Sequence, residues 1–394
     1  MGSSSLRIVV TGMAVTYPLG GVFWDYIQYP LGLARLGHDV LYLEDTERWF
    51  YDPVGETFVE SGDQNARRFA AFVSDFAPPL EDRWSVRDVR GDSFGRSWRE
   101  VQEFCRTADV FLNVSASVSP REEYLSAQVC AIIDSDPLYT QAWARDVPNL
   151  LSPYDVVFTF GLNVGSPGCP IETHGREWIP TRQPVVLDSF ASQVVPLFER
   201  RRVLTTVASW EPKEKGPEVN GVKFYGKSVE LERFMGFPRR SPLPMEIALS
   251  GPAPRQLFED QGWLLRDPFS VSGRPGDYRD YLAHSFAEWS VAKNAYVATR
   301  SGWFSCRSAC YLALGVPVIV QDTGFGDTVP TGEGVLAFET LDEATAAVEE
   351  VMANYPKHSR AAGEIAEAFF DSDRVLSELL ESAHRVHPAL RGTV

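Results

Sequence analysis

The sequence predicts an α/β protein of two domains, each with a parallel sheet between layers of helices. Two patterns support this. Short apolar runs alternate with amphipathic segments along most of the chain, which is typical of repeated strand–helix units. In addition, 394 residues are many for a single core and suit two domains of roughly 150–200 residues each.

The first strand–helix–strand unit lies at the N-terminus. The apolar run over residues 6–12 predicts a strand, and the spacing of apolar residues over 24–36 predicts a helix. Gly37 ends this helix, and residues 39–43 form the second strand. This arrangement is a βαβ unit, which requires a parallel pair of strands.

Similar apolar runs mark the remaining strands. In the first half they cover residues 110–114, 129–133, 156–160 and 184–187. A second cycle starts at residue 203 and includes strands at 222–224, 245–249, 263–265, 295–298 and 316–320. We expect a first domain over residues 1–190, a second over 191–370, and a C-terminal helix over 371–394 that crosses back to the first domain.

Composition excludes several classes of protein. The net charge of −16 disfavours a broad nucleic-acid surface, which needs dense Lys and Arg, but permits a local basic pocket for a small anion. The five cysteines form no CxxC pair and have no metal partner at zinc-site spacing, so neither a metal nor a resident cofactor is expected. No apolar run approaches the ~20 residues of a membrane span, and the N-terminus is not a secretory signal. We therefore expect a cytoplasmic protein.

The segment from residue 292 to 325 carries the strongest functional signal. A turn at Arg300-Ser301-Gly302 precedes a short helix over residues 307–314, and an apolar strand over 316–320 follows the break at Gly315. A loop that leads into a helix N-terminus offers free N–H groups and the positive end of the helix dipole to an anion. This pattern predicts a phosphate-bearing nucleotide ligand.

Several residues of this segment are candidates for ligand contacts. Ser305 and Ser308 either cap the helix or contact a diphosphate, and Arg307 beside them suits a phosphate. Asp322, with the Thr323-Gly324 turn, suits sugar hydroxyls, because a carboxylate accepts from two adjacent groups; an ordinary turn is the alternative. The other candidates for the donor site are Lys227, Arg300, Lys293, Gly302 and Trp303.

These residues resemble those of GT-B glycosyltransferases. The block from Ser301 to Phe325, SGWFSCRSACYLALGVPVIVQDTGF, is similar to the donor-side helix and strand of bacterial members. The stretch from Gly20 to Asp45, with LGHDV before its strand, is similar to the acceptor-side entry. The resemblance implies two Rossmann-like domains facing across a cleft, with a nucleotide sugar on the C-terminal domain and no obligatory metal.

The sequence departs from this family at two motifs, and one of them is the His-Gly-Gly entry common in inverting plant-type members, which is absent here. Many retaining members carry two glutamates eight residues apart before the Gly-x-Pro-Val strand, whereas Gly302 and Cys310 occupy those positions here. The sequence therefore leaves inversion and retention of configuration open.

On the acceptor side, we expect contacts from Gly20, Gly21, Trp24 and Asp25. A tight turn is the alternative for the glycines, and a place in the core is the alternative for the tryptophan.

Three residues are candidates for the general base. Asp134 and Asp136 follow a predicted strand in the sequence Asp-Ser-Asp-Pro and would project toward the cleft, or else cap the next turn. His174, in a loop, has a side chain that titrates near neutral pH, although a lone loop histidine is usually just exposed.

The predicted function is transfer of a sugar from a nucleotide-diphosphate donor to a hydroxyl-bearing acceptor, a hexosyltransferase reaction without a metal. The alternatives are a sugar-nucleotide epimerase or phosphorylase of the same fold, and a catalytically silent nucleotide-binding subunit. An oxidoreductase would need a GxGxxG fingerprint, which the N-terminal unit lacks.

Overall fold

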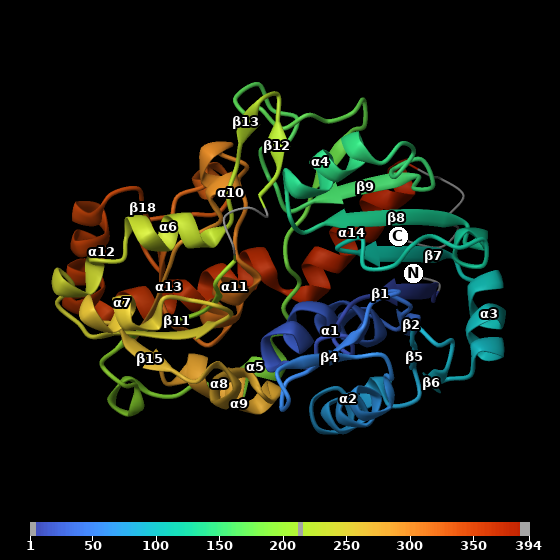
Figure 1. The fold of residues 1–394 in the computed structure, drawn as a ribbon, viewed down its shortest axis with the longest axis horizontal. Helices are drawn as coiled ribbons and strands as arrows, with labels where there is room; N and C mark the ends of the chain where they lie inside the picture. Colours follow the sequence, from blue (N-terminus) through green and yellow to red (C-terminus); the bar gives the residue numbers. More distant parts are fainter. Residues whose placement is uncertain (1–4, 212–215, 387–394) are drawn as a thin grey trace.

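The computed structural model describes residues 5–211 and 216–386, which form two lobes with one main sheet each (Figure 1). The strands of the first sheet are β1 (Arg7–Thr11), β2 (Asp39–Glu44), β5 (Trp84–Arg87), β6 (Ser93–Gly95), β7 (Val110–Val114), β8 (Val129–Asp134), β9 (Val156–Thr159) and β10 (Trp178–Pro180). Their order in the sheet is β10-β9-β8-β7-β1-β2-β5-β6, and every pair is parallel except β5 and β6.

The second sheet is parallel throughout. Its strands are β11 (Leu204–Ser209), β14 (Met245–Ser250), β15 (Leu264–Arg266), β16 (Ala287–Ser290), β17 (Val318–Gln321) and β18 (Val335–Phe338). They are ordered β15-β14-β11-β16-β17-β18. The predicted α/β class with two Rossmann-like domains is therefore confirmed.

Two small antiparallel hairpins stand outside the main sheets, namely β3 (Phe50–Asp52) with β4 (Thr57–Val59) and β12 (Glu218–Val219) with β13 (Val222–Lys223). The predicted strand at 222–224 therefore belongs to a hairpin and not to the second sheet.

Helices cover both sheets. Those of the first lobe are α1 (Gly20–Arg35), α2 (Asp63–Phe76), α3 (Trp98–Arg106), α4 (Tyr139–Asp146) and α5 (Asp188–Ala191). The others are α6 (Lys227–Arg233), α7 (Arg255–Asp260), α8 (Pro268–Ser272), α9 (Pro275–Ala283), α10 (Asn294–Ala298), α11 (Cys306–Ala313), α12 (Leu341–Ala353), α13 (Tyr355–Ile365) and α14 (Ser372–Val386). No helix in the described ranges combines the length and the apolar character needed to cross a bilayer.

Two predicted elements are wrong. Residues 295–298 were expected to form a strand, but they belong to helix α10, and the strand of this segment is β16 at Ala287–Ser290. A short apolar segment reads the same way in a buried helix and a buried strand, and here pairing with β11 and β17 decides the conformation. Residues 184–187 form only a single bridge from Val185 to Asp371, and the edge strand is β10.

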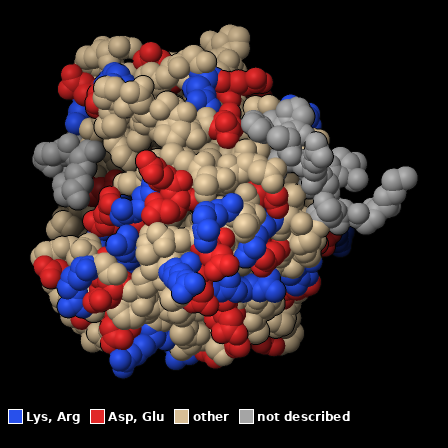
Figure 2. Space-filling view, turned by 90° about the vertical axis from the view of Figure 1, so that its right-hand side faces the viewer, with Lys and Arg blue, Asp and Glu red and all other residues tan. Residues whose placement is uncertain are grey.

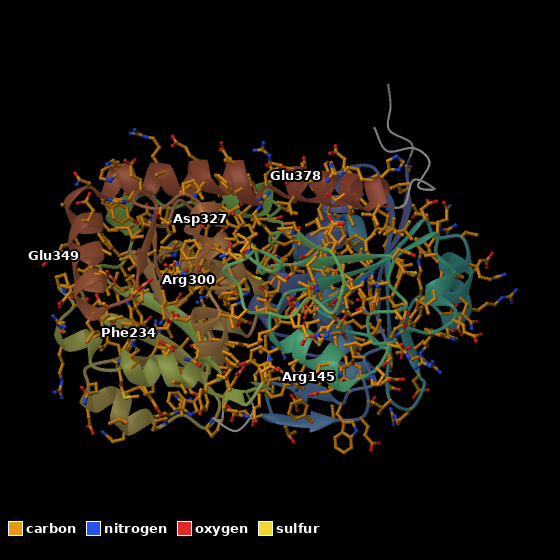
Figure 3. All side chains as sticks on the ribbon, turned by 90° about the horizontal axis from the view of Figure 1, so that it is seen from above. Arg145, Phe234, Arg300, Asp327, Glu349 and Glu378 are labelled. Carbon is orange, nitrogen blue, oxygen red and sulfur yellow. The ribbon has the colours of Figure 1, made fainter. Side chains whose placement is uncertain are left out.

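The C-terminal helix α14 reaches the first lobe and packs against α1. A Cβ atom at Gly32 of α1 would lie only 2.5 Å from Cδ1 of Leu376, so the glycine permits this close approach. Arg182 donates to Glu378 at 2.8 Å, and Figure 3 shows Glu378 on the long helical segment that runs along one side of the molecule. Residues 387–394 of the predicted 371–394 segment lie outside the described part of the chain.

Candidate functional site

A cleft of about 660 Å³ lies between the two lobes. The first lobe contributes residues from α1, from the β3–β4 hairpin and from the turn after β8; the second contributes residues from β11 and β14 and from the segments that lead into α6, α10 and α11. Ser209, Ser250 and Asp136 mark the carboxyl ends of three of these strands or the turn that follows. The cleft therefore lies where ligands gather in open parallel sheets.

Among the described residues, the basic side chains that line this cleft all come from one of its two lobes. Lys227, Arg255, Lys293 and Arg307 line it, and all four belong to the second lobe. Arg307 stands in the first turn of α11, so its charge adds to the positive end of that helix dipole. The wall that they form is suited to an anionic group.

Arg307 is held in place from behind the cleft. Its Nε donates to Glu288 Oε1 at 2.7 Å, and a terminal nitrogen donates to the carbonyl of Val207 at 2.6 Å. Burial lowers the pKa of Arg307, but the Glu288 carboxylate, together with Tyr278 and Tyr311, gives a net rise in that pKa. Glu288 is completely buried on β16.

Of these four cations, Lys227 is the one with neither an ion pair nor a hydrogen bond among the described residues, since Arg255 donates to the carbonyl of Leu249. Burial lowers the pKa of Lys227 to about 7, and repulsion by Arg307 contributes in the same direction. Within residues 5–211 and 216–386 its ammonium has no ion-pair or hydrogen-bond partner. A bound anion would favour the charged form of this side chain.

Asp25 faces these cations from α1 of the first lobe. Burial raises the pKa of Asp25 to about 7, although the positive charge of Arg307 lowers it in part. Its carboxylate lines the cleft and has no hydrogen-bond partner among the described residues. Asp25 therefore titrates close to neutral pH at the place where the two lobes meet.

Of the two candidate aspartates, Asp134 is the last residue of β8, and its carboxylate is fully hydrogen-bonded to the protein. Its carboxylate accepts hydrogen bonds from the hydroxyls of Thr140 (2.7 Å) and Thr159 (2.8 Å), the amide of Gln141 (2.9 Å) and the backbone N–H of Asp136 (2.9 Å). It is buried and absent from the cleft lining. This aspartate fixes the turn that follows β8.

Asp136 does line the cleft, but its charge is already paired. The ammonium of Lys293 lies 2.7 Å from one carboxylate oxygen, and the hydroxyl of Tyr296 donates to the other. Burial would lower the pKa of Lys293, yet Asp136 and Glu211 reverse the effect and raise it. Asp136 therefore joins the first lobe to Lys293 of the second.

His174 lies outside the cleft lining. Its backbone adopts a positive φ of 52°, and its Nε2 lies 2.8 Å from the carbonyl of Gln141, to which it donates. The structure thus places His174 beside α4 and not among the residues that line the cleft.

The predicted donor residues divide into two groups. Trp303, Ser305 and Arg307 line the cleft together with Lys227. Ser308 is fully buried and borders a separate, much smaller cavity, and its hydroxyl has no hydrogen-bond partner among the described residues. The loop that enters α11 therefore does face the space between the lobes.

The second group supports this loop without lining the cleft. Asp322 accepts from Gly324 N–H at 2.7 Å and pairs with Arg300 at 3.4 Å. Thr323 donates its hydroxyl to the carbonyl of Trp303 at 2.6 Å, and its own carbonyl accepts from Gly302 N–H at 2.8 Å. These contacts hold the turns together, which is the alternative that the sequence left open for Asp322.

The acceptor-side residues divide in the same way. Gly21 and Asp25 line the cleft, whereas Gly20 and Trp24 attach α1 to α9 of the second lobe. A Cβ at Gly20 would lie 2.3 Å from the carbonyl oxygen of Arg274, and Trp24 donates from Nε1 to Pro275 at 3.0 Å.

Sequence reasoning missed several residues that line the cleft. They are Tyr51 and Glu56 of the hairpin, Arg255 of α7, and Phe269 and Tyr278 of α8 and α9. None belongs to a motif, and only the tertiary structure brings them together.

Comparison with known proteins gives a fold but no close relative. No family model matches the sequence, and no curated protein matches it. AviGT4, a glycosyltransferase involved in avilamycin A biosynthesis, shares 14% identity at a TM-score of 0.57 over 97% of this chain and 98% of its own. An alpha-glucosyltransferase in complex with UDP and DNA shares 10% identity at 0.58 over 96% and 100%. A glycosyltransferase from Rickettsia africae shares 10% identity at 0.53 over 98% and 99%. The chain therefore has the GT-B fold of these glycosyltransferases.

Proposed function

We propose that this protein is a glycosyltransferase that moves a sugar from a nucleoside-diphosphate donor to a hydroxyl-bearing acceptor. The observation that carries the proposal is the convergence of Lys227, Lys293 and Arg307 on the cleft from the second lobe. The fold supports it, because similar structures include glycosyltransferases and one of them holds UDP.

The diphosphate belongs on the wall formed by these cations. The entry of α11, through Ser305 and Arg307, adds a helix N-terminus to the same wall. Lys227 gains most from an anion, because its charge is otherwise disfavoured by burial and by Arg307. Positive charge on Lys227, Lys293 and Arg307 stabilises negative charge as it develops on a departing diphosphate.

The transfer step moves one bond and one proton. The acceptor oxygen forms a bond to the anomeric carbon of the donor sugar, while the bond from that carbon to the diphosphate oxygen breaks. The electron pair of the broken bond leaves with the nucleoside diphosphate, and the acceptor hydroxyl loses its proton.

Asp25 is our candidate for the group that receives this proton. Its pKa of about 7 matches the working range of a general base, and it lies across the cleft from Arg307. Asp134 is held in four hydrogen bonds and Asp136 is paired with Lys293, so neither is available in the same way.

We further propose that transfer needs no divalent ion, because Lys227, Lys293 and Arg307 supply the positive charge that a metal supplies in other phosphate sites. Activity should then be unchanged by EDTA. Loss of turnover in EDTA, with recovery on addition of magnesium or manganese, would contradict this part of the proposal alone.

A thermal-shift screen with UDP, GDP, dTDP and CDP tests the donor site. A nucleotide that binds the folded state raises the melting temperature, and Lys227→Gln should reduce that shift. Arg300→Gln is the matched control, since Arg300 is a cation of the same lobe that lies outside the cleft. If no nucleotide shifts the melting temperature of the wild type, the proposed function fails.

A further inference from the structure

Apolar side chains from both lobes form part of the cleft lining beside the four cations. The first lobe and α8 contribute the following apolar and aromatic residues to the cleft: Leu19, Val22, Tyr51, Pro53, Pro268 and Phe269. This surface is continuous with the proposed donor site, because one cavity contains both.

The β3–β4 hairpin extends this apolar surface outward. The ring of Tyr51 lies 5.4 Å from that of Phe58, and Tyr17 lies 6.3 Å from Phe58 in an edge-to-face arrangement. Phe58 is nevertheless 49% exposed, and Val54 at the tip is 68% exposed. Figure 1 shows the hairpin on the side of the first lobe that faces α8 and α9. Such exposure next to a cleft is typical of a binding surface.

The charged side chains that the first lobe contributes to the described cleft lining are all acidic. They are Asp25, Glu56 and Asp136. On the outer face of this lobe, Figure 2 shows basic and acidic side chains intermixed, without a continuous basic surface. No cation of this lobe lines the cleft among the described residues, so a phosphate on the acceptor would meet carboxylates there. Arg68 of α2 lies outside the lining, with its guanidinium 5.4 Å from the ring of Phe269.

We propose that the acceptor is an uncharged, ring-bearing hydrophobic compound with a free hydroxyl, bound between the hairpin and α8, and not a nucleic acid or a phosphorylated molecule. This assignment rests on the proposed transferase function, and it identifies the class of the second substrate. The ring system would lie against Tyr51, Pro53 and Phe269, with the hydroxyl directed inward to Asp25.

Three matched probes test this assignment on the full chain. Naphthol has a neutral ring and a hydroxyl, naphthyl phosphate has the same ring with a negative group, and glycerol has hydroxyls without a ring. Binding is measured by fluorescence titration, which is run with the cation wall saturated by the nucleotide that gives the largest shift in the thermal screen. We then expect naphthol to bind and the other two to bind at least about tenfold more weakly, because only naphthol offers a ring without charge repulsion.

Variants locate the binding surface. Tyr51→Ala should weaken naphthol binding about tenfold, and Tyr51→Phe should restore it because the ring is retained. Phe269→Ser provides a second test on the other lobe, at a position exposed enough to be changed without disturbing the core. Phe198→Ser is the matched control, since Phe198 is 86% exposed and lies outside the cleft.

Two outcomes would overturn the assignment: equal binding of naphthol and naphthyl phosphate, or naphthol binding that neither Tyr51→Ala nor Phe269→Ser weakens. The nucleotide screen separates this failure from failure of the proposed function. A nucleotide shift without naphthol preference contradicts only the acceptor class, whereas naphthol binding without any nucleotide shift contradicts the transferase function.

Discussion

Arg307 donates from Nε to Oε1 of Glu288 at 2.7 Å, whereas the second oxygen of that carboxylate, Oε2, is buried without a hydrogen-bond partner among the described residues. The charge of Glu288 thus depends on a single guanidinium. The same guanidinium faces the cleft, so one pair links the stability of the second lobe to its ligand site.

Removing Arg307 should therefore destabilise the protein strongly. We expect Arg307→Met to lower the free energy of unfolding by about 3–5 kcal/mol, because it leaves Glu288 as an unpaired buried charge. Urea unfolding measures this change. The double variant with Glu288→Leu should recover most of the loss, and a single and double variant of equal stability would show that the pair does not act in this way.

Nucleotide binding should take up a proton through Lys227. Its folded pKa of about 7 lies below the ordinary 10.5, so above pH 7 the free protein holds it mostly neutral, and a bound diphosphate raises its pKa. Affinity should therefore fall as the pH rises above 7. Calorimetry in buffers of different ionisation enthalpy measures the uptake, which Lys227→Met should abolish.

The same shift predicts an effect on stability without ligand. Because the folded pKa of Lys227 is lowered, the protonated form is penalised at and below pH 7, and the penalty disappears as the pH approaches 10.5. Lys227→Met should raise the melting temperature at pH 6 relative to the wild type, and by less at high pH. An equal gain at both ends would mean that the methionine acts through packing alone.

Asp25→Asn should show the opposite dependence on pH. The folded pKa of about 7 lies above the ordinary 3.8, so stability is lost as the pH rises from about 4 to 7 and the carboxylate ionises. The asparagine variant should be more stable than the wild type above pH 7 and nearly equal to it below pH 4. Melting temperatures across this range provide the measurement.

If Asp25 receives the acceptor proton, Asp25→Asn should also reduce the rate of transfer by about 10²–10⁴-fold. Glu56→Gln is a suitable control, because Glu56 is another carboxylate that lines the cleft from the first lobe. A rate that falls equally in both variants would point to general electrostatics and not to a base.

Asp134→Asn should affect folding and not chemistry. The amide cannot accept all four hydrogen bonds that the carboxylate accepts, so we expect a loss of about 1–3 kcal/mol in unfolding free energy. Transfer at saturating substrate should be nearly unchanged below the melting temperature. A large fall in rate without loss of stability would restore Asp134 as a candidate base.

The sequence predicted local features of this protein better than the spatial arrangement of its segments. The first βαβ unit and the loop into α11 were predicted because their turns and apolar spacing are local signals. The position of Asp322 to Gly324 outside the cleft lining could not be predicted, because it depends on strand order: cleft residues lie at the ends of β11 and β14 and just after β16, while β17 lies one strand further along the sheet. Likewise, only folding brings Asp25 opposite Arg307, which are 282 residues apart in the chain.

The contact between α1 and the start of α9 joins the two lobes at one side of the cleft. Gly20 lies against the carbonyl of Arg274, and Trp24 donates a hydrogen bond to the carbonyl of Pro275, so the two lobes are in direct contact beside the cleft. The lobes therefore cannot separate completely while these two contacts are intact. An alanine at position 20 would place its Cβ 2.3 Å from the carbonyl oxygen of Arg274, so we infer that it would push α1 and α9 apart and alter the width of the cleft.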